Sequence, residues 1–124
     1  MRYSVLVVDD DPMKRQLLRF ILERAGFGVA EAADGIEALS VLADSVPDLM
    51  TLDVMMPRMD GFTVCAQVRE NPKMADLPII MVSAKVDRSS IQQGMDAGAT
   101  HYLSQPVMPD NLIKIVNELL PQPN

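Results

Sequence analysis

Residues 50–61 of this 124-residue chain read MTLDVMMPRMDG, the most informative stretch of the sequence. An apolar run ends in one acidic residue, Asp53, and a proline and an Asp-Gly pair typical of turns follow it. A strand that carries a carboxylate at its C-terminal end and then breaks into a loop is typical of open α/β sheets, which build their sites there. A second apolar run, Val5–Val8, also ends in acidic residues, at Asp9–Asp11. The two runs predict one shared acidic pocket.

The rest of the chain alternates short apolar runs with segments whose apolar residues recur at helical spacing. This pattern predicts an α/β fold, a doubly wound five-stranded parallel sheet of the flavodoxin-like (βα)5 type, with five helices covering both faces. The predicted strands are residues 4–9, 27–32, 48–53, 77–82 and 101–103, and the predicted helices are residues 12–25, 35–43, 61–70, 88–97 and 109–120. We expect one domain over residues 1–120, with 121–124 as a tail or the start of a linker.

The spacing of apolar residues also predicts which helix faces are buried. Met13 and Leu17 belong to such a face in the first helix, and Ile91 and Met95 to one in the fourth. Asp11 directly precedes the first helix and is its predicted N-cap.

Composition argues against several classes of function. A formal net charge of −6 without a basic block disfavours direct nucleic-acid binding. No apolar run is long enough to span a membrane, and the N-terminus leads directly into a predicted strand rather than a secretory signal. The single cysteine, Cys65, cannot form an internal disulfide, which favours a cytoplasmic location. Glycine-rich dinucleotide and triphosphate motifs are absent, and His101 has no partners for a zinc site.

The C-terminal ends of the predicted strands bring several polar residues to one edge of the sheet. Asp9, Asp10 and Asp53 come from the first and third strands, and Ser83 and Gln105 follow the fourth and fifth. Clustered carboxylates raise one another's pKa unless a cation lies among them, and Mg²⁺ suits such oxygen ligands. A hydroxyl and an amide can hydrogen-bond a bound anion, which completes a phosphoryl-transfer site. Helix capping alone would also explain the first acidic run.

These motifs resemble those of a bacterial response-regulator receiver domain, the CheY-like phosphoacceptor of two-component signalling, over essentially the whole chain. The pair Asp9-Asp10 resembles the family's metal-binding acidic pair, and Asp53 followed by residues 56–61 resembles its phosphorylated aspartate and signature loop. Ser83-Ala84 resembles the hydroxyl and small-residue switch pair, and Tyr102 resembles the aromatic switch residue.

The resemblance implies a mechanism. A histidine kinase or histidine phosphotransfer protein would transfer a phosphoryl group from its phosphohistidine to Asp53. Mg²⁺ would be held by Asp10 directly, by Asp9 through water, by Asp53, and by the main-chain carbonyl of Met55.

The same resemblance implies how the phosphorylated state is read. Ser83 would move to hydrogen-bond a phosphoryl oxygen, and Tyr102 would follow inward and reshape the surface of the fourth helix, fifth strand and fifth helix. The signal would reach a downstream protein or an output domain beyond this chain and decay by hydrolysis. The chain would act as a monomer or a weak phosphorylation-dependent dimer, as a signalling phosphoacceptor rather than an enzyme, with no membrane partner.

One residue departs from the family pattern. The family normally carries a lysine before the proline of the fifth strand, joined to it by a cis bond, and this chain has Gln105 before Pro106. The amide still donates a hydrogen bond, but the loss of the charge costs about 1.5–3 kcal/mol of phosphoryl stabilisation. We therefore expect slower phosphorylation, a weaker phosphorylated state or a rewired switch. We hypothesise that Lys85, two residues past Ser83, partly replaces the missing charge.

Two alternatives stay open. The first is a pseudo-receiver that docks to proteins with little or no phosphorylation, because of Gln105. The second is a Mg²⁺-dependent phosphatase with Asp53 as nucleophile. That class carries a second acid two residues after the nucleophile, where this chain has Met55.

Overall fold

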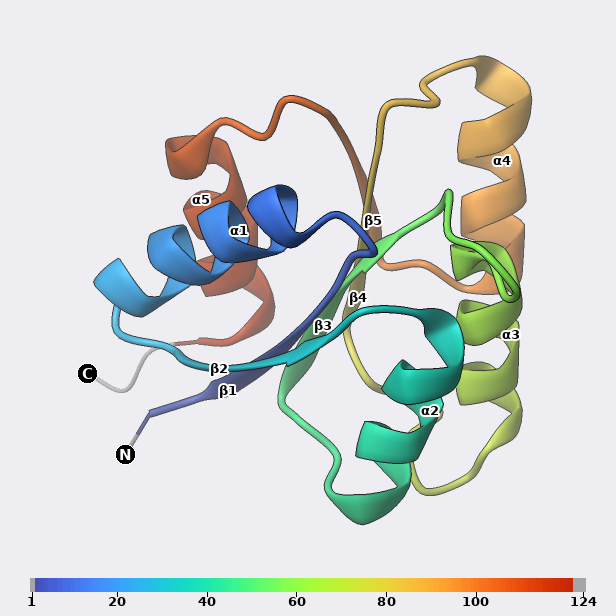
Figure 1. Ribbon diagram of the computed structural model, residues 1–124, viewed down its shortest axis with the longest axis horizontal. Helices are drawn as coiled ribbons and strands as arrows, with labels where there is room; N and C mark the ends of the chain where they lie inside the picture. The colour runs from blue at the N-terminus through green and yellow to red at the C-terminus, as the bar shows by residue number, and fades with distance from the viewer. Residues whose placement is uncertain (1, 122–124) are drawn as a thin grey trace.

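The computed structural model describes residues 2–121, in which strands and helices alternate strictly (Figure 1). The strands are β1 (Ser4–Val8), β2 (Gly28–Ala32), β3 (Leu49–Asp53), β4 (Ile79–Ser83) and β5 (His101–Ser104). The helices are α1 (Pro12–Arg24), α2 (Gly35–Asp44), α3 (Gly61–Glu70), α4 (Arg88–Ala97) and α5 (Pro109–Leu119). All ten predicted elements are therefore confirmed. Of the predicted tail, only Pro121 is described, and its carbonyl accepts a hydrogen bond from the Tyr3 hydroxyl.

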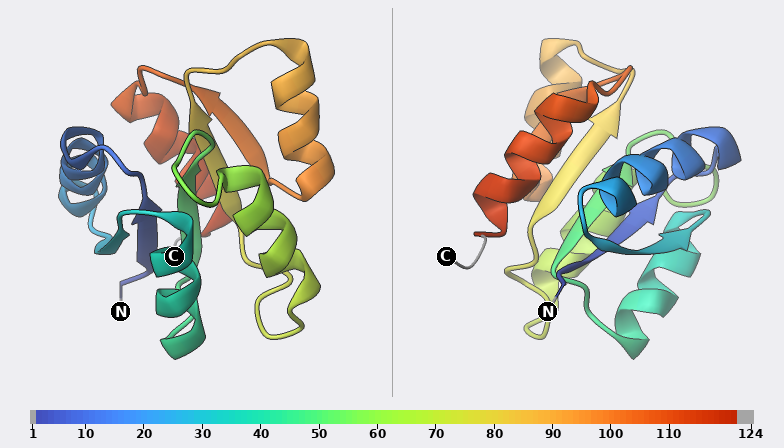
Figure 2. Two further views of the ribbon diagram at one scale, coloured as in Figure 1. Left: turned by 45° about the vertical axis from the view of Figure 1, so that its right-hand side comes forward. Right: turned by 90° about the vertical axis from the view of Figure 1, so that its left-hand side faces the viewer.

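The five strands form one parallel sheet in the order β2-β1-β3-β4-β5. Figure 2 shows α1 and α5 against one face and α2, α3 and α4 against the other. Because both faces are covered, every residue of the central strands β3 and β4 is buried. The doubly wound α/β prediction is confirmed.

Side chains along each strand alternate between two apolar cores. In β1, Val5 and Val7 join the core beneath α1 and α5, whereas Leu6 and Val8 join the core beneath α2, α3 and α4. Both faces of the sheet are therefore packed, and the loops at its C-terminal edge leave from this packed core.

The predicted buried face of α1 is partly wrong. Met13 is 80% exposed and Leu17 is 55% exposed, while Leu18, Ile21 and Leu22 are buried. On a helix of 3.6 residues per turn, Met13 and Leu17 lie to one side of the stripe formed by these three buried residues. They therefore remain on the surface.

The predicted buried face of α4 is wrong. Ile91 and Met95 are exposed, and the small residues Ser90 and Gly94 are buried instead. A Cβ atom at Gly94 would lie 2.9 Å from the Tyr102 ring, so only a small residue fits where α4 meets β5.

Within residues 2–121, no helix combines the length and the apolar character that a bilayer crossing requires.

Candidate functional site

The acidic pocket lies where β1 and β3 end. These strands are neighbours, and their register aligns Val8 with Leu52, so the residues that follow, Asp9 and Asp53, come side by side. Carboxylate oxygens of Asp9, Asp10 and Asp53 all lie within 4.8 Å of one another. Asp9 is 1% exposed and Asp53 is 6% exposed, whereas Asp10 faces solvent. The predicted shared pocket is confirmed.

Burial and mutual repulsion dominate the electrostatics of this pocket. Burial, followed by the negative charge of Asp9, raises the pKa of Asp53 to about 6. Burial also raises the pKa of Asp9, against a hydrogen bond from the Asp11 N–H that lowers it. Hard carboxylate oxygens at this separation, with one group open to water, fit a small divalent cation such as Mg²⁺. A bound cation would relieve the repulsion that the raised pKa values reflect.

The first acidic run, Asp9–Asp11, both caps α1 and contributes side chains to the acidic pocket. Asp11 caps α1, because its Oδ1 accepts a hydrogen bond of 2.9 Å from the Met13 N–H, as predicted. Arg15, which the sequence did not point to, donates from Nη1 to the carbonyl oxygen of Asp9 at 2.8 Å and from Nε to Glu31 at 2.9 Å. These bonds fix the loop backbone, so the Asp9 side chain is held in the pocket.

The loop after β3 is closed tightly by glycine. The Gly61 N–H donates to the carbonyl of Val54 at 2.9 Å, and a Cβ atom at Gly61 would lie only 2.3 Å from the Asp53 carbonyl oxygen. Asp60, which the sequence predicted in a turn, is the N-cap of α3 and accepts from the Thr63 N–H at 2.9 Å. Gly61 therefore allows α3 to begin directly against the backbone that carries Asp53.

Ser83 and Tyr102 both contact the backbone of Lys85. Ser83 is fully buried at the end of β4, one residue beyond Val82, which pairs with Asp53. Its Oγ accepts a hydrogen bond from the Lys85 N–H at 3.0 Å. The hydroxyl of Tyr102 donates to the Lys85 carbonyl, and its ring is half-buried beside Gly94.

Gln105 sits at the same edge. Its N–H donates to the Ser83 carbonyl at 3.0 Å, and its bond to Pro106 is cis. Its side-chain Oε1 accepts a hydrogen bond of 3.0 Å from Nζ of Lys14, a residue that the sequence reasoning missed. The signal was present, because Lys14 lies in the first turn of the helix that follows the acidic run.

Lys85 is exposed, and its charge acts on a different carboxylate. Hydrogen bonds from Ser90 lower the pKa of Asp87, and the Lys85 charge adds to that effect. The role proposed for Lys85 as a substitute charge, and that of the Met55 carbonyl as a ligand, stay predictions.

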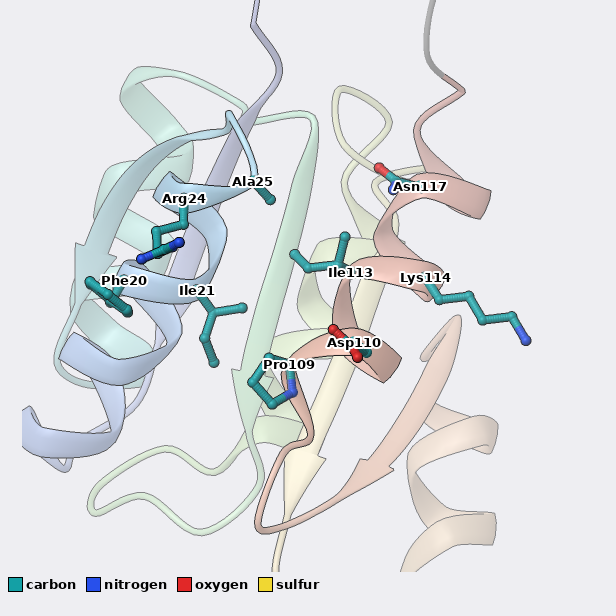
Figure 3. A pocket seen from close by; sticks show the side chains of 9 residues that line it. All are labelled: Phe20, Ile21, Arg24, Ala25, Pro109, Asp110, Ile113, Lys114 and Asn117. Atoms are coloured by element: carbon teal, nitrogen blue, oxygen red, sulfur yellow. The ribbon is translucent and has the colours of Figure 1, made fainter.

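A hollow lies away from these residues, between α1 and α5 (Figure 3). This groove of about 540 Å³ is lined by Phe20, Ile21, Arg24, Ala25, Pro109, Asp110, Ile113, Lys114 and Asn117. The Arg24 guanidinium lies 5.6 Å from the centroid of the exposed Phe20 ring. None of the candidate site residues lines this groove.

Comparison with known proteins places these residues in context. Residues 5–117 match the model of the response regulator receiver domain family. The chain is 45% identical over 115 residues to an uncharacterised 14.6 kDa protein of Leptolyngbya boryana, covering 93% of this chain and 88% of that protein. The structure of the chemotaxis protein CheY4 of Vibrio cholerae superimposes with a TM-score of 0.91 at 35% identity, covering 97% of this chain and 100% of that one.

Other relatives are longer. The chain is 39% identical over 116 residues to RpaA of Synechocystis sp., a DNA-binding dual master transcriptional regulator, covering 94% of this chain and 48% of that protein. The chain thus spans about half the length of the first curated relatives that it matches.

Proposed function

Since the chain belongs to the response-regulator receiver family, we propose that it accepts a phosphoryl group on Asp53 from a phosphohistidine of a kinase or phosphotransfer protein. The observation that carries this proposal is the cluster of Asp9, Asp10 and Asp53, with carboxylate oxygens within 4.8 Å of one another around a buried strand end. Receivers are signalling phosphoacceptors rather than conventional enzymes, so family membership removes the phosphatase alternative.

The metal site would be formed by Asp9, Asp10 and Asp53 with the main-chain carbonyl of Met55. Mg²⁺ bound there supplies positive charge that offsets the negative charge of the pocket and of the transferring group. The raised pKa of Asp53, caused first by burial and then by Asp9, supports this assignment because uncompensated carboxylates are unfavourable there.

In the transfer step, a carboxylate oxygen of Asp53 forms a bond to phosphorus. The phosphorus–nitrogen bond to the donor histidine breaks, and the imidazole keeps the electron pair and takes up a proton. Ser83 is suited to stabilise the product: its Oγ already accepts from the Lys85 N–H, which leaves its O–H free to donate to a phosphoryl oxygen.

The Lys85 backbone offers a route by which the modified site reaches the surface. Its N–H contacts Ser83 and its carbonyl contacts Tyr102, so a displacement of Ser83 toward a phosphoryl group would move both groups. We infer that the readout is a change at α4, β5 and α5, because the ring of Tyr102 on β5 lies directly against Gly94 of α4.

The test is direct. Incubation with Mg²⁺ and acetyl phosphate should add the mass of one phosphoryl group, and the Asp53→Asn variant should add none. Gln105 favours the second candidate, a pseudo-receiver that docks without being phosphorylated, because it removes a charge from the phosphoryl site. No mass gain in the wild type, together with unchanged NMR spectra in beryllofluoride, would support that candidate and refute the first.

The partners follow from the same proposal. The donor is a histidine kinase or a histidine phosphotransfer protein in the cytoplasm. The receiver then acts either on a separate downstream protein or on an output domain beyond this chain, as the greater length of RpaA suggests. We expect a monomer or a weak dimer that forms on phosphorylation.

A further inference from the structure

Lys14 is a positively charged neighbour of the acidic pocket, and its ammonium group is hydrogen-bonded to the side chain of Gln105. The four ion pairs within residues 2–121 use Glu23, Glu31 and Asp34, and none involves Asp9, Asp10 or Asp53. Lys14 instead reaches Gln105, 91 residues away in sequence, through a hydrogen bond of 3.0 Å. Its charge is felt at the pocket: against the rise caused by burial, it lowers the pKa of both Asp9 and Asp53.

The hydrogen bond from Lys14 also orients the Gln105 amide. An ammonium group has only donors, so it requires Oε1 of the amide on its side. The NH₂ group of Gln105 then points elsewhere and keeps its two donors for another acceptor. Lys14 and Gln105 also line a groove of about 350 Å³, together with apolar residues that include Leu17, Val82 and Pro106.

We propose that Lys14 and Gln105 act as one unit that supplies the positive charge of the phosphoryl site, with Gln105 as the positioning residue. This inference rests on the function proposed above. The charge comes from α1 rather than from β5, where the family resemblance places a lysine. Hydrogen bonds from Ser90 lower the pKa of Asp87, and the charge of Lys85 adds a smaller lowering there.

A positive charge at this position has opposite effects on the two ligands of the site. It repels Mg²⁺ and attracts the phosphoryl group. Lys14→Gln should therefore bind Mg²⁺ more tightly and be phosphorylated more slowly. Structural damage would weaken both, so the opposite signs identify an electrostatic role. Lys14 is exposed, and a screened single charge corresponds to changes of about 3- to 10-fold in each quantity.

The experiment measures two quantities on the whole chain. Mg²⁺ affinity is obtained by calorimetric titration without phosphodonor, and the phosphorylation rate by mass spectrometry with acetyl phosphate at Mg²⁺ saturation for each variant. The matched control is Lys73→Gln, which removes the same charge in the exposed loop before β4, at the opposite edge of the sheet (Figure 1). The control should change neither quantity.

Two further variants test whether the residues form a unit. Gln105→Leu removes the acceptor, and Lys14→Gln combined with Gln105→Leu should slow phosphorylation by less than the product of the single effects. Lys14→Gln combined with Gln105→Lys restores a charge from β5 and should recover the rate lost in Lys14→Gln.

The outcomes separate this inference from the function on which it rests. Equal behaviour of Lys14→Gln and Lys73→Gln, or a loss of both Mg²⁺ affinity and phosphorylation in Lys14→Gln, would overturn the role of Lys14. If Lys14→Gln with Gln105→Leu slows phosphorylation by the full product of the two single effects, then Lys14 and Gln105 act independently rather than as one unit. Absence of phosphorylation in the wild type would instead refute the proposed function, and the Mg²⁺ titration would still show whether Lys14 places its charge at the pocket.

Discussion

Replacing Asp53 with asparagine should make the metal-free protein more stable, although it removes the proposed phosphorylation site. Burial and the neighbouring Asp9 raise the pKa of Asp53 from 3.8 to about 6. A carboxyl group whose folded-state pKa is raised contributes stability below its unfolded pKa and loses it as the pH rises through the folded pKa. The free energy of unfolding of the wild type therefore falls between about pH 4 and pH 7 as Asp53 ionises. Asp53→Asn has no carboxyl group at this position and does not show this fall.

The size of the effect follows from the shift. One pKa unit corresponds to about 1.4 kcal/mol. The free energy of unfolding of the variant should therefore exceed that of the wild type by about 1 kcal/mol at pH 4.5 and about 3 kcal/mol at pH 7.5. Asparagine keeps an oxygen that can accept the hydrogen bond of 3.4 Å from the Met55 N–H. With a urea m value of about 1.5 kcal/mol/M, the midpoint at pH 7.5 should rise by roughly 2 M.

Urea unfolding followed by circular dichroism, in a metal chelator at both pH values, measures this difference. The control is Asp76→Asn, which removes an exposed carboxylate before β4 and should change stability by less than about 0.5 kcal/mol. Adding Mg²⁺ should reduce the gap, because the cation stabilises the folded wild type. If Asp53→Asn and the wild type have the same free energy of unfolding, or differ equally at the two pH values, then burial and repulsion do not destabilise ionised Asp53.

Three further outcomes are expected. Mg²⁺ at 100 times its Kd should stabilise the wild type by about 2.7 kcal/mol in thermal melts, and Asp10→Asn should lose most of this gain, whereas equal gains would contradict the metal site. Gly61→Ala should lower the free energy of unfolding in urea by about 2 kcal/mol or more, because its Cβ would meet the Asp53 carbonyl at 2.3 Å; an unchanged midpoint would count against this contact. Thr51→Val should raise it by about 1 kcal/mol, since the buried Thr51 Oγ1 has no hydrogen-bond partner among the described residues; destabilisation would mean that the hydroxyl is satisfied.

The order of elements could be predicted from sequence because each one carries its own signal. The strands β3 and β4 are short apolar runs, and α1 begins at an aspartate followed by proline, as helices often do. The buried faces were harder to predict. In α4, the side that packs on the sheet is set by the Tyr102 ring and Met81, which arrive from elsewhere in the chain. Apolar periodicity within one helix contains no information about such contacts.

The acidic pocket could be predicted because parallel strands bring their C-terminal ends to one edge whatever their distance in sequence. Asp9 and Asp53 meet through strand order and register alone. The contact between Lys14 and Gln105 depends instead on the direction of two long side chains from α1 and the β5–α5 loop. Side-chain direction is decided by packing, and for this reason the sequence suggested Lys85, which is nearer in sequence to Ser83.

The aspartates at this edge of the sheet divide into two groups by their position relative to strands and helices. Asp11, Asp34, Asp60 and Asp87 each precede a helix and accept backbone N–H bonds as N-caps. The other group, Asp9, Asp10 and Asp53 of the acidic pocket, lies at or directly after strand ends and caps no helix; Asp9 and Asp53 each accept a loop N–H, from Asp11 and Met55. Helix capping satisfies a carboxylate within the folded chain, and burial without capping leaves it in need of a cation. Helix capping therefore explains Asp11, and the acidic pocket explains Asp9 and Asp10. The pocket carboxylates, which cap no helix, are the ones available for chemistry.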